Sequence, residues 1–221
     1  MSITLFYYPR SASLAPHLML HHVQADYQLK LVDKKTDSQK SASYLRLNPT
    51  GRIPTLVMDE QPIFESAAIC IHIAESFADF RLIPELGQPL RPLFFQWLTY
   101  LNNTLQNELM LRFYPQRHTS KPQQVESIKQ AQEQRLGDIW MVIDQQLCNK
   151  RYLLGDELTA CDYFLFMLAT WSIDLQYSPL SFANLRGYLQ RLARNATIVA
   201  VCRIEGIDLT RFDSERLRYT L

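Results

Sequence analysis

The order of predicted secondary structure is the feature that most constrains the fold of this chain. Short apolar or alternating runs in the first third predict strands at residues 3–8, 27–33, 53–59 and 61–65. Apolar residues at helical spacing predict helices at 14–24 and 65–77, and "SASYLRLNP" predicts a short helical turn. From residue 93 strand patterns cease, and helices are predicted at 93–115, 122–150, 160–175, 183–195 and 196–206. An α/β module is therefore followed by an all-helical bundle.

The boundary between the two parts lies in "RLIPELGQPLRP", a stretch rich in proline and glycine. We therefore predict a domain at residues 1–80, a linker at 81–92 and a helical domain at 93–221. A length of 221 residues is compatible with two compact domains.

The charge balance excludes several classes of protein. Lys and Arg total 23 and Asp and Glu total 22, so the chain lacks the basic excess of a nucleic-acid binder or a protein that binds anionic membranes. The apolar run "YFLFMLATW" is far shorter than the roughly 20 residues that span a bilayer, and no signal-peptide pattern opens the sequence. We expect a cytoplasmic protein without membrane or nucleic-acid partners.

The four cysteines do not form a metal or disulfide pattern. They are scattered and include no CxxC pair, so we expect no metal site. Cys70 and Cys161 lie in apolar segments and are predicted to be core residues. Thr159 and Asp162, three residues apart before an apolar run, predict a capping box at a helix start, which is a folding signal.

Three stretches of the sequence together resemble the cytosolic glutathione transferase family. They are "YYPRSASLAPHLML", "LNPTGRIPTLVMDEQPIFESAAI" and "YLLGDELTACDYFLF", and the first is most similar to the bacterial beta class. The most specific part is Asn48-Pro49-x-Gly51-x-Ile53-Pro54, followed by Glu65-Ser66. The resemblance implies a thioredoxin-like α/β domain, an all-α helical bundle, glutathione as co-substrate and a homodimer.

The resemblance also implies which residues hold glutathione. A cis peptide bond at Pro54 turns the backbone of Ile53 toward the ligand peptide, which pairs with it as an added strand does. The alternative is an ordinary trans proline at the start of a strand. Ser66, at a helix N-terminus, binds the γ-glutamyl carboxylate and Glu65 places the ammonium. Simple helix capping is the alternative, and the two roles are compatible.

A lysine in "DKKTD" matches the position that contacts the glycine carboxylate of glutathione in similar proteins. Lys35 is the first choice and Lys34 is a close competitor. A solvated loop lysine is the alternative reading.

The turn "PRSAS" is the predicted place of thiol activation. A hydroxyl donor and a helix N-terminus stabilise the thiolate, which is the nucleophile. The beta class carries a cysteine in this turn where the chain has Ala12, so Ser11 and Ser13 are the candidate catalytic groups, with Ser11 favoured and Ser13 an alternative cap. Tyr7 is a third candidate, for which strand packing is the alternative.

The electrophile is expected to lie against the first helix of the bundle. The candidate lining residues are Tyr100, Asn103, Gln106 and Tyr114, with a dimer interface or the surface as the alternative for several of them. The expected reaction is attack of the glutathione thiolate on a small hydrophobic electrophile, giving a thioether without a metal. Glutathione-dependent disulfide reduction or isomerisation is a second possibility, and a non-catalytic binding module is a third.

Overall fold

The computed structural model describes residues 1–213, and its first domain is built on a four-stranded sheet. The strands are β1 (Ile3–Tyr7), β2 (Tyr27–Leu31), β3 (Thr55–Met58) and β4 (Gln61–Phe64), in the order β2-β1-β3-β4. β1 runs parallel to β2 and antiparallel to β3, and β3 and β4 form an antiparallel hairpin. All four predicted strands are present, each shorter than predicted.

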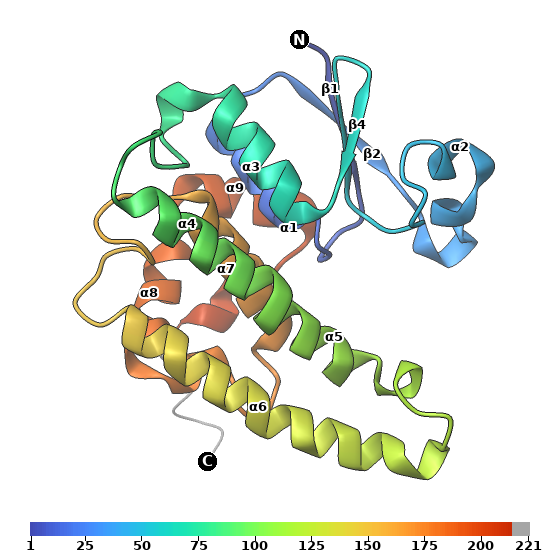
Figure 1. Ribbon diagram of the computed structural model, residues 1–221, viewed down its shortest axis with the longest axis vertical. Coiled ribbons are helices and arrows are strands. Elements are labelled where there is room, and N and C mark those ends of the chain that lie inside the picture. The colour runs from blue at the N-terminus through green and yellow to red at the C-terminus, as the bar shows by residue number, and fades with distance from the viewer. Residues whose placement is uncertain (214–221) are drawn as a thin grey trace.

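Helices cover both faces of this sheet (Figure 1). α1 (Leu14–His22) and α3 (Ser66–Ser76) lie between the sheet and the second domain, whereas the short α2 (Ala42–Leu45) lies on the other side. The alternation of side chains along β1 explains this arrangement, since neighbours in a strand point to opposite faces. Leu5 is fully buried in the core, and the adjacent Phe6 contacts Tyr44 of α2.

The second domain is helical throughout its described part. Its helices are α4 (Leu90–Thr99), a π-helical segment (Tyr100–Leu105), α5 (Gln106–Phe113), α6 (Val125–Gln146), α7 (Ala160–Ser172), α8 (Ala183–Leu192) and α9 (Ala196–Glu205). Short 3₁₀ turns occur in both domains. Those of the first are Lys34–Thr36, Ser38–Lys40 and Ala78–Phe80, and those of the second are Pro115–Arg117, Pro122–Gln124, Pro179–Ser181 and Leu209–Phe212. Among residues 1–213, no helix has the length and apolar character needed to cross a bilayer.

The predicted linker is too long at its C-terminal end. α4 begins at Leu90, so Pro92 lies in the first turn of the helix rather than in the linker. A proline is accommodated there because the first N–H groups of a helix have no intrahelical partner. The helix predicted at 93–115 is present as α4, the π-helical segment and α5, which run on from one another (Figure 1).

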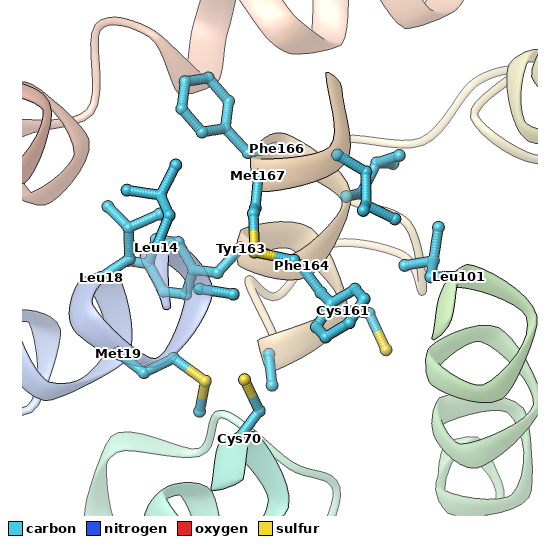
Figure 2. Close-up of a cluster of buried hydrophobic side chains, with 14 of the residues drawn as sticks. Leu14, Leu18, Met19, Cys70, Leu101, Cys161, Tyr163, Phe164, Phe166 and Met167 are labelled. Carbon is cyan, nitrogen blue, oxygen red and sulfur yellow. The ribbon is translucent and has the colours of Figure 1, made fainter. Parts of the chain in front are cut away.

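α7 forms the centre of the core that joins the two domains. It packs against α1 and α3 of the first domain and against α4 and the π-helical segment of the second. Figure 2 shows Leu14, Leu18 and Met19 of α1 and Cys70 of α3 gathered around this helix. Cys70 and Cys161 are fully buried, as predicted. The two domains therefore share one apolar core, which fixes their relative orientation.

The carboxylate of Asp162 organises the start of α7. It is completely buried and accepts hydrogen bonds from the backbone N–H groups of Leu153 (2.8 Å) and Thr159 (2.7 Å) and from the Tyr188 hydroxyl (2.7 Å). Burial raises the pKa of this carboxyl, and the hydrogen bonds oppose the rise. The predicted capping role is confirmed, and the same carboxylate also ties α8 to α7.

Candidate functional site

A cleft of about 830 Å³ opens at the junction of the two domains, where ligand sites are common. Its walls come from the β1–α1 turn, the loops before α2 and β3, the start of α3 and the α4–α5 helix. Seven predicted site residues line it: Ser11, Ile53, Pro54, Glu65, Ser66, Gln106 and Tyr114. Five others do not: Tyr7, Ser13, Lys35, Tyr100 and Asn103.

The loop before β3 is held in shape by Asn48. Its Nδ2 donates to the carbonyl of Arg52 (2.8 Å), and its Oδ1 accepts from the backbone N–H of Thr50 (3.1 Å). Tyr44 donates a second hydrogen bond to the same carbonyl (2.6 Å). Gly51 has a φ of +62°, and a Cβ there would also lie 3.3 Å from the carbonyl oxygen of Gln39. Asn48 and Gly51 therefore fix the loop that presents Ile53 and Pro54.

Those two residues offer a free peptide edge to the cleft. The Ile53–Pro54 bond is cis, as the resemblance implied. Neither the N–H nor the C=O of Ile53 has a backbone partner in the described part of the chain, and β3 begins only at Thr55. An extended peptide in the cleft can pair with Ile53 as an added strand.

The N-terminus of α3 forms a second polar corner of the cleft. Ser66 is 4% exposed, and its hydroxyl donates to the carbonyl of Ala12 (2.6 Å), which joins α3 to the β1–α1 turn. The first N–H groups of a helix lack intrahelical partners and favour an anion. Glu65 precedes the helix with a φ of +72° and an exposed side chain, so one carboxylate stands beside this anion-binding corner.

The two serines of the turn have different surroundings. Ser13 is fully buried; its hydroxyl donates to the carbonyl of Tyr8 (3.1 Å) and accepts from the N–H of Tyr8 (3.3 Å). Because Ser13 thereby uses its proton, Ser11 is the donor in the 3.0 Å contact between the two hydroxyls. Ser11 lines the cleft and can rotate its proton toward a ligand, whereas Ser13 is held by the strand end.

The second domain fixes this turn from behind. Glu205 of α9 accepts from the backbone N–H of Arg10 (3.0 Å) and contacts Nδ1 of His17 at 2.7 Å, in a pair whose side chains are fully buried. The Arg10 guanidinium donates to the carbonyl of Gly206. Arg10 itself has a φ of +59°, so these bonds hold it in a left-handed conformation that non-glycine residues rarely adopt.

The structure places Lys34, and not Lys35, in the cleft wall. The ammonium of Lys34 lies 4.8 Å from the centre of the Tyr8 ring, and partial desolvation lowers its pKa. Asp33 caps the 3₁₀ turn by accepting a hydrogen bond from the backbone N–H of Lys35 (2.8 Å), and the Lys35 side chain is absent from the lining. The lining therefore favours Lys34, the close competitor, over Lys35, and the contact of either lysine with glutathione stays a prediction.

The helical wall contains two of its four predicted residues. Gln106 and Tyr114 line the cleft, but Asn102 takes the place of Asn103, which is exposed. The ring of Tyr100 packs against Trp97 with 5.5 Å between ring centres. The signal that finds this wall is a spacing of four, because Asn102, Gln106, Met110 and Tyr114 follow one another at that interval and all line the cleft.

Tyr7 lies outside the site that was predicted for it. Its ring is 6.2 Å from that of His17 and packs on the core, in agreement with the strand-packing alternative. Sequence reasoning missed Arg10, Gln39, Arg52, Arg117, His118 and Trp171. Arg52 could have been predicted because it directly precedes the Ile-Pro motif. Trp171, by contrast, is brought to the cleft only by the packing of α7.

Comparison with known proteins agrees with this geometry. The sequence models of the glutathione S-transferase N-terminal and C-terminal domains match residues 1–75 and 101–196. Glutathione S-transferase GST-4.5 of Xanthomonas campestris is 26% identical over 204 residues, which are 92% of this chain and 99% of that protein.

Two solved structures share the fold. A beta-class glutathione S-transferase of Sphingomonas chungbukensis is 26% identical with a TM-score of 0.81, covering 93% of this chain and 100% of that one. A glutathione transferase homologue of Sulfitobacter with bound glutathione has a TM-score of 0.85 at 20% identity, covering 94% and 99%. The predicted thioredoxin-like domain followed by a helical bundle is confirmed. Since the two domain models together match well over half of the chain, it belongs to the glutathione S-transferase family.

Proposed function

We propose that this protein is a glutathione transferase that joins the glutathione thiolate to an electrophilic small molecule. One observation carries the proposal. A free peptide edge at Ile53, a helix N-terminus at Ser66 and Ser11, a serine that is 7% exposed, line the same cleft. These are the groups that a γ-linked tripeptide with a central thiol requires, and the family of the chain supports the assignment.

In the proposed complex each end of glutathione meets a matching group. The γ-glutamyl carboxylate lies at the N-terminus of α3 with Ser66, and its ammonium lies near Glu65. The cysteinyl backbone pairs with Ile53. The glycine carboxylate lies toward Lys34 and Arg52, which both line the cleft. This arrangement directs the central thiol toward the β1–α1 turn.

The turn activates the thiol through a hydroxyl rather than a cysteine. Ala12 stands where the beta class implies a cysteine, so the turn itself supplies no sulfur for a mixed disulfide. Ser11 donates to the thiolate, while Ser13 remains bonded to Tyr8 and keeps the turn in shape. A charge-assisted hydrogen bond favours the ionised form and lowers the pKa of the bound thiol.

The reaction then needs no further cofactor. The thiolate forms a C–S bond with the electrophilic carbon, and a leaving group departs with the electron pair of its bond. The thiol proton goes to solvent. The second substrate lies against the helical wall that contains Gln106 and Tyr114.

Titration calorimetry with glutathione tests the binding half of this proposal. We expect binding below millimolar concentration, and no heat at millimolar glutathione would favour a non-catalytic binding module. Initial rates with a chlorinated nitrobenzene and with a small disulfide test the reaction. Conjugation is expected to dominate, and reduction of the disulfide without conjugation would overturn it.

We further propose a homodimer in the cytoplasm. Phe64 of β4 and Leu90, Leu93 and Phe95 of α4 are exposed apolar side chains, which favour a partner surface. Four unpaired cysteines are typical of a reducing compartment. Light scattering coupled to gel filtration measures the mass, and a monomer at micromolar concentration would contradict the dimer.

A further inference from the structure

The charged residues of the cleft are mostly positive. Arg10, Lys34, Arg52 and Arg117 line it, against a single acidic residue among the described lining residues, Glu65. The whole chain has a formal net charge of only +1. Positive charge is therefore concentrated at this cleft, where low-dielectric walls strengthen its effect on a ligand.

Glutathione does not account for all of this charge, if the proposed function holds. In the proposed complex its ammonium pairs with Glu65, one carboxylate binds at the N-terminus of α3, and the other carboxylate pairs with Lys34 and Arg52. Arg10 and Arg117 remain. The guanidinium of Arg10 is already bonded to the carbonyl of Gly206. Arg117 is the cation with no such partner.

Arg117 is positioned but unpaired. Its guanidinium lies 4.2 Å from the centre of the Tyr114 ring, and it makes no ion pair or side-chain hydrogen bond with residues 1–213. Stacking on an aromatic ring leaves the planar edge of a guanidinium free for a carboxylate. Both residues follow α5, on the side of the cleft that receives the second substrate.

Three residues of the cleft wall also carry a buried polar atom without a partner in the described chain. The atoms are Nε1 of Trp171, a donor, and Oε1 of Gln39 and of Gln106. The oxygen and nitrogen of a glutamine amide are exchangeable by a flip, so each glutamine can offer either. Buried polar atoms without partners are costly, so these walls favour a polar occupant over a purely hydrophobic one.

We propose that the electrophile is an acid, with an activated carbon for the thiolate and a carboxylate that Arg117 binds. This inference rests on the proposed function and replaces the small hydrophobic electrophile of the sequence-based expectation. For an aryl chloride the C–S bond forms, the C–Cl bond breaks and chloride leaves. Arg117 is a specificity-determining residue and takes no part in bond making.

The test uses two substrates that differ only at the acid: a chlorodinitrobenzoate and its methyl ester. Each kcat/KM is divided by the uncatalysed rate constant, which removes the difference in intrinsic reactivity. We expect the acid to be favoured about tenfold, the scale of one charge-assisted hydrogen bond. Arg117→Gln should remove about that factor for the acid and change the ester less than about twofold. Arg194→Gln, which removes an exposed arginine outside the cleft, should change neither.

Binding of the two thioether products provides a readout that does not need turnover. The acid product should bind about tenfold more tightly than the ester product, and Arg117→Gln should abolish the difference. If the ester is conjugated but the acid has no advantage, or Arg117→Gln affects both equally, the inference is wrong and the transferase function stands. If glutathione and both products fail to bind, both proposals fall.

Discussion

Replacing Ser11 with alanine tests the assignment of the thiol-activating group. Ser11 is the one hydroxyl of the turn that lines the cleft, while the Ser13 proton is used by the carbonyl of Tyr8. Loss of one charge-assisted hydrogen bond costs about 1.5–3 kcal/mol. At about 1.36 kcal/mol per unit, the pKa of the bound thiol should rise by roughly 1–2 units.

The pH dependence of kcat/KM reads this shift directly. Activity follows the thiolate, so it rises through the pKa of the bound thiol and reaches a plateau above it. At pH values below the pKa of the bound thiol, a raised pKa lowers kcat/KM because less thiolate is present. The expected loss is only about three- to tenfold, because a more basic thiolate is also more nucleophilic. Above both pKa values, Ser11→Ala should equal or exceed the wild type. Absorbance of the thiolate in the binary complex measures the same pKa without turnover.

Ser13→Ala is the matched control. Its hydroxyl serves Tyr8 in a fully buried position, so removal should cost about 1–3 kcal/mol of folding stability through unsatisfied backbone groups. The thiol pKa should change by less than about half a unit. An unchanged pKa in Ser11→Ala, with a raised pKa in Ser13→Ala, would refute the reasoning from the hydrogen bonds.

Three further results are expected. Asp162→Ala should lower the free energy of unfolding in urea by about 3–5 kcal/mol, since it leaves four buried donors without this acceptor; a loss below about 1 kcal/mol would contradict this. At pH 8 a thiol reagent should modify the exposed Cys148 rapidly and the other cysteines only after unfolding, because burial raises the pKa of Cys202 to about 12; rapid modification of more than one thiol in the native protein would argue against this. Lys34→Met should weaken glutathione binding about three- to tenfold in calorimetry and Lys35→Met less than about twofold, whereas the reverse order would restore the original choice.

The sequence predicted the elements well because their signals are local. Alternation marks β2, and the capping pair Thr159 and Asp162 marks the start of α7. Pro92 misled the boundary because a proline that ends a linker and one that opens a helix look alike in sequence. The π-helical segment (Tyr100–Leu105) has no comparable signal, and the two predicted wall residues that miss the cleft, Tyr100 and Asn103, both lie in it.

The glutathione side of the cleft was predictable where a motif names the residue. Ile53 and Ser66 belong to such a motif and line the cleft, whereas the choice between Lys34 and Lys35 depended on a single 3₁₀ turn. Trp171 comes to the cleft from a helix more than a hundred residues beyond the motif. No pattern along the chain encodes that approach, because it depends on how α7 packs between the domains.

The buried contact of Glu205 with His17 has a consequence for biosynthesis. Glu205, which accepts the hydrogen bond from the backbone N–H of Arg10, lies almost 200 positions later in the chain. The β1–α1 turn therefore gains this hydrogen bond only when α9 has left the ribosome. A nascent or truncated chain that contains the sheet alone lacks this fastening. The β1–α1 turn is therefore among the last parts of the protein to gain its full set of contacts, although its own residues are among the first to be synthesised.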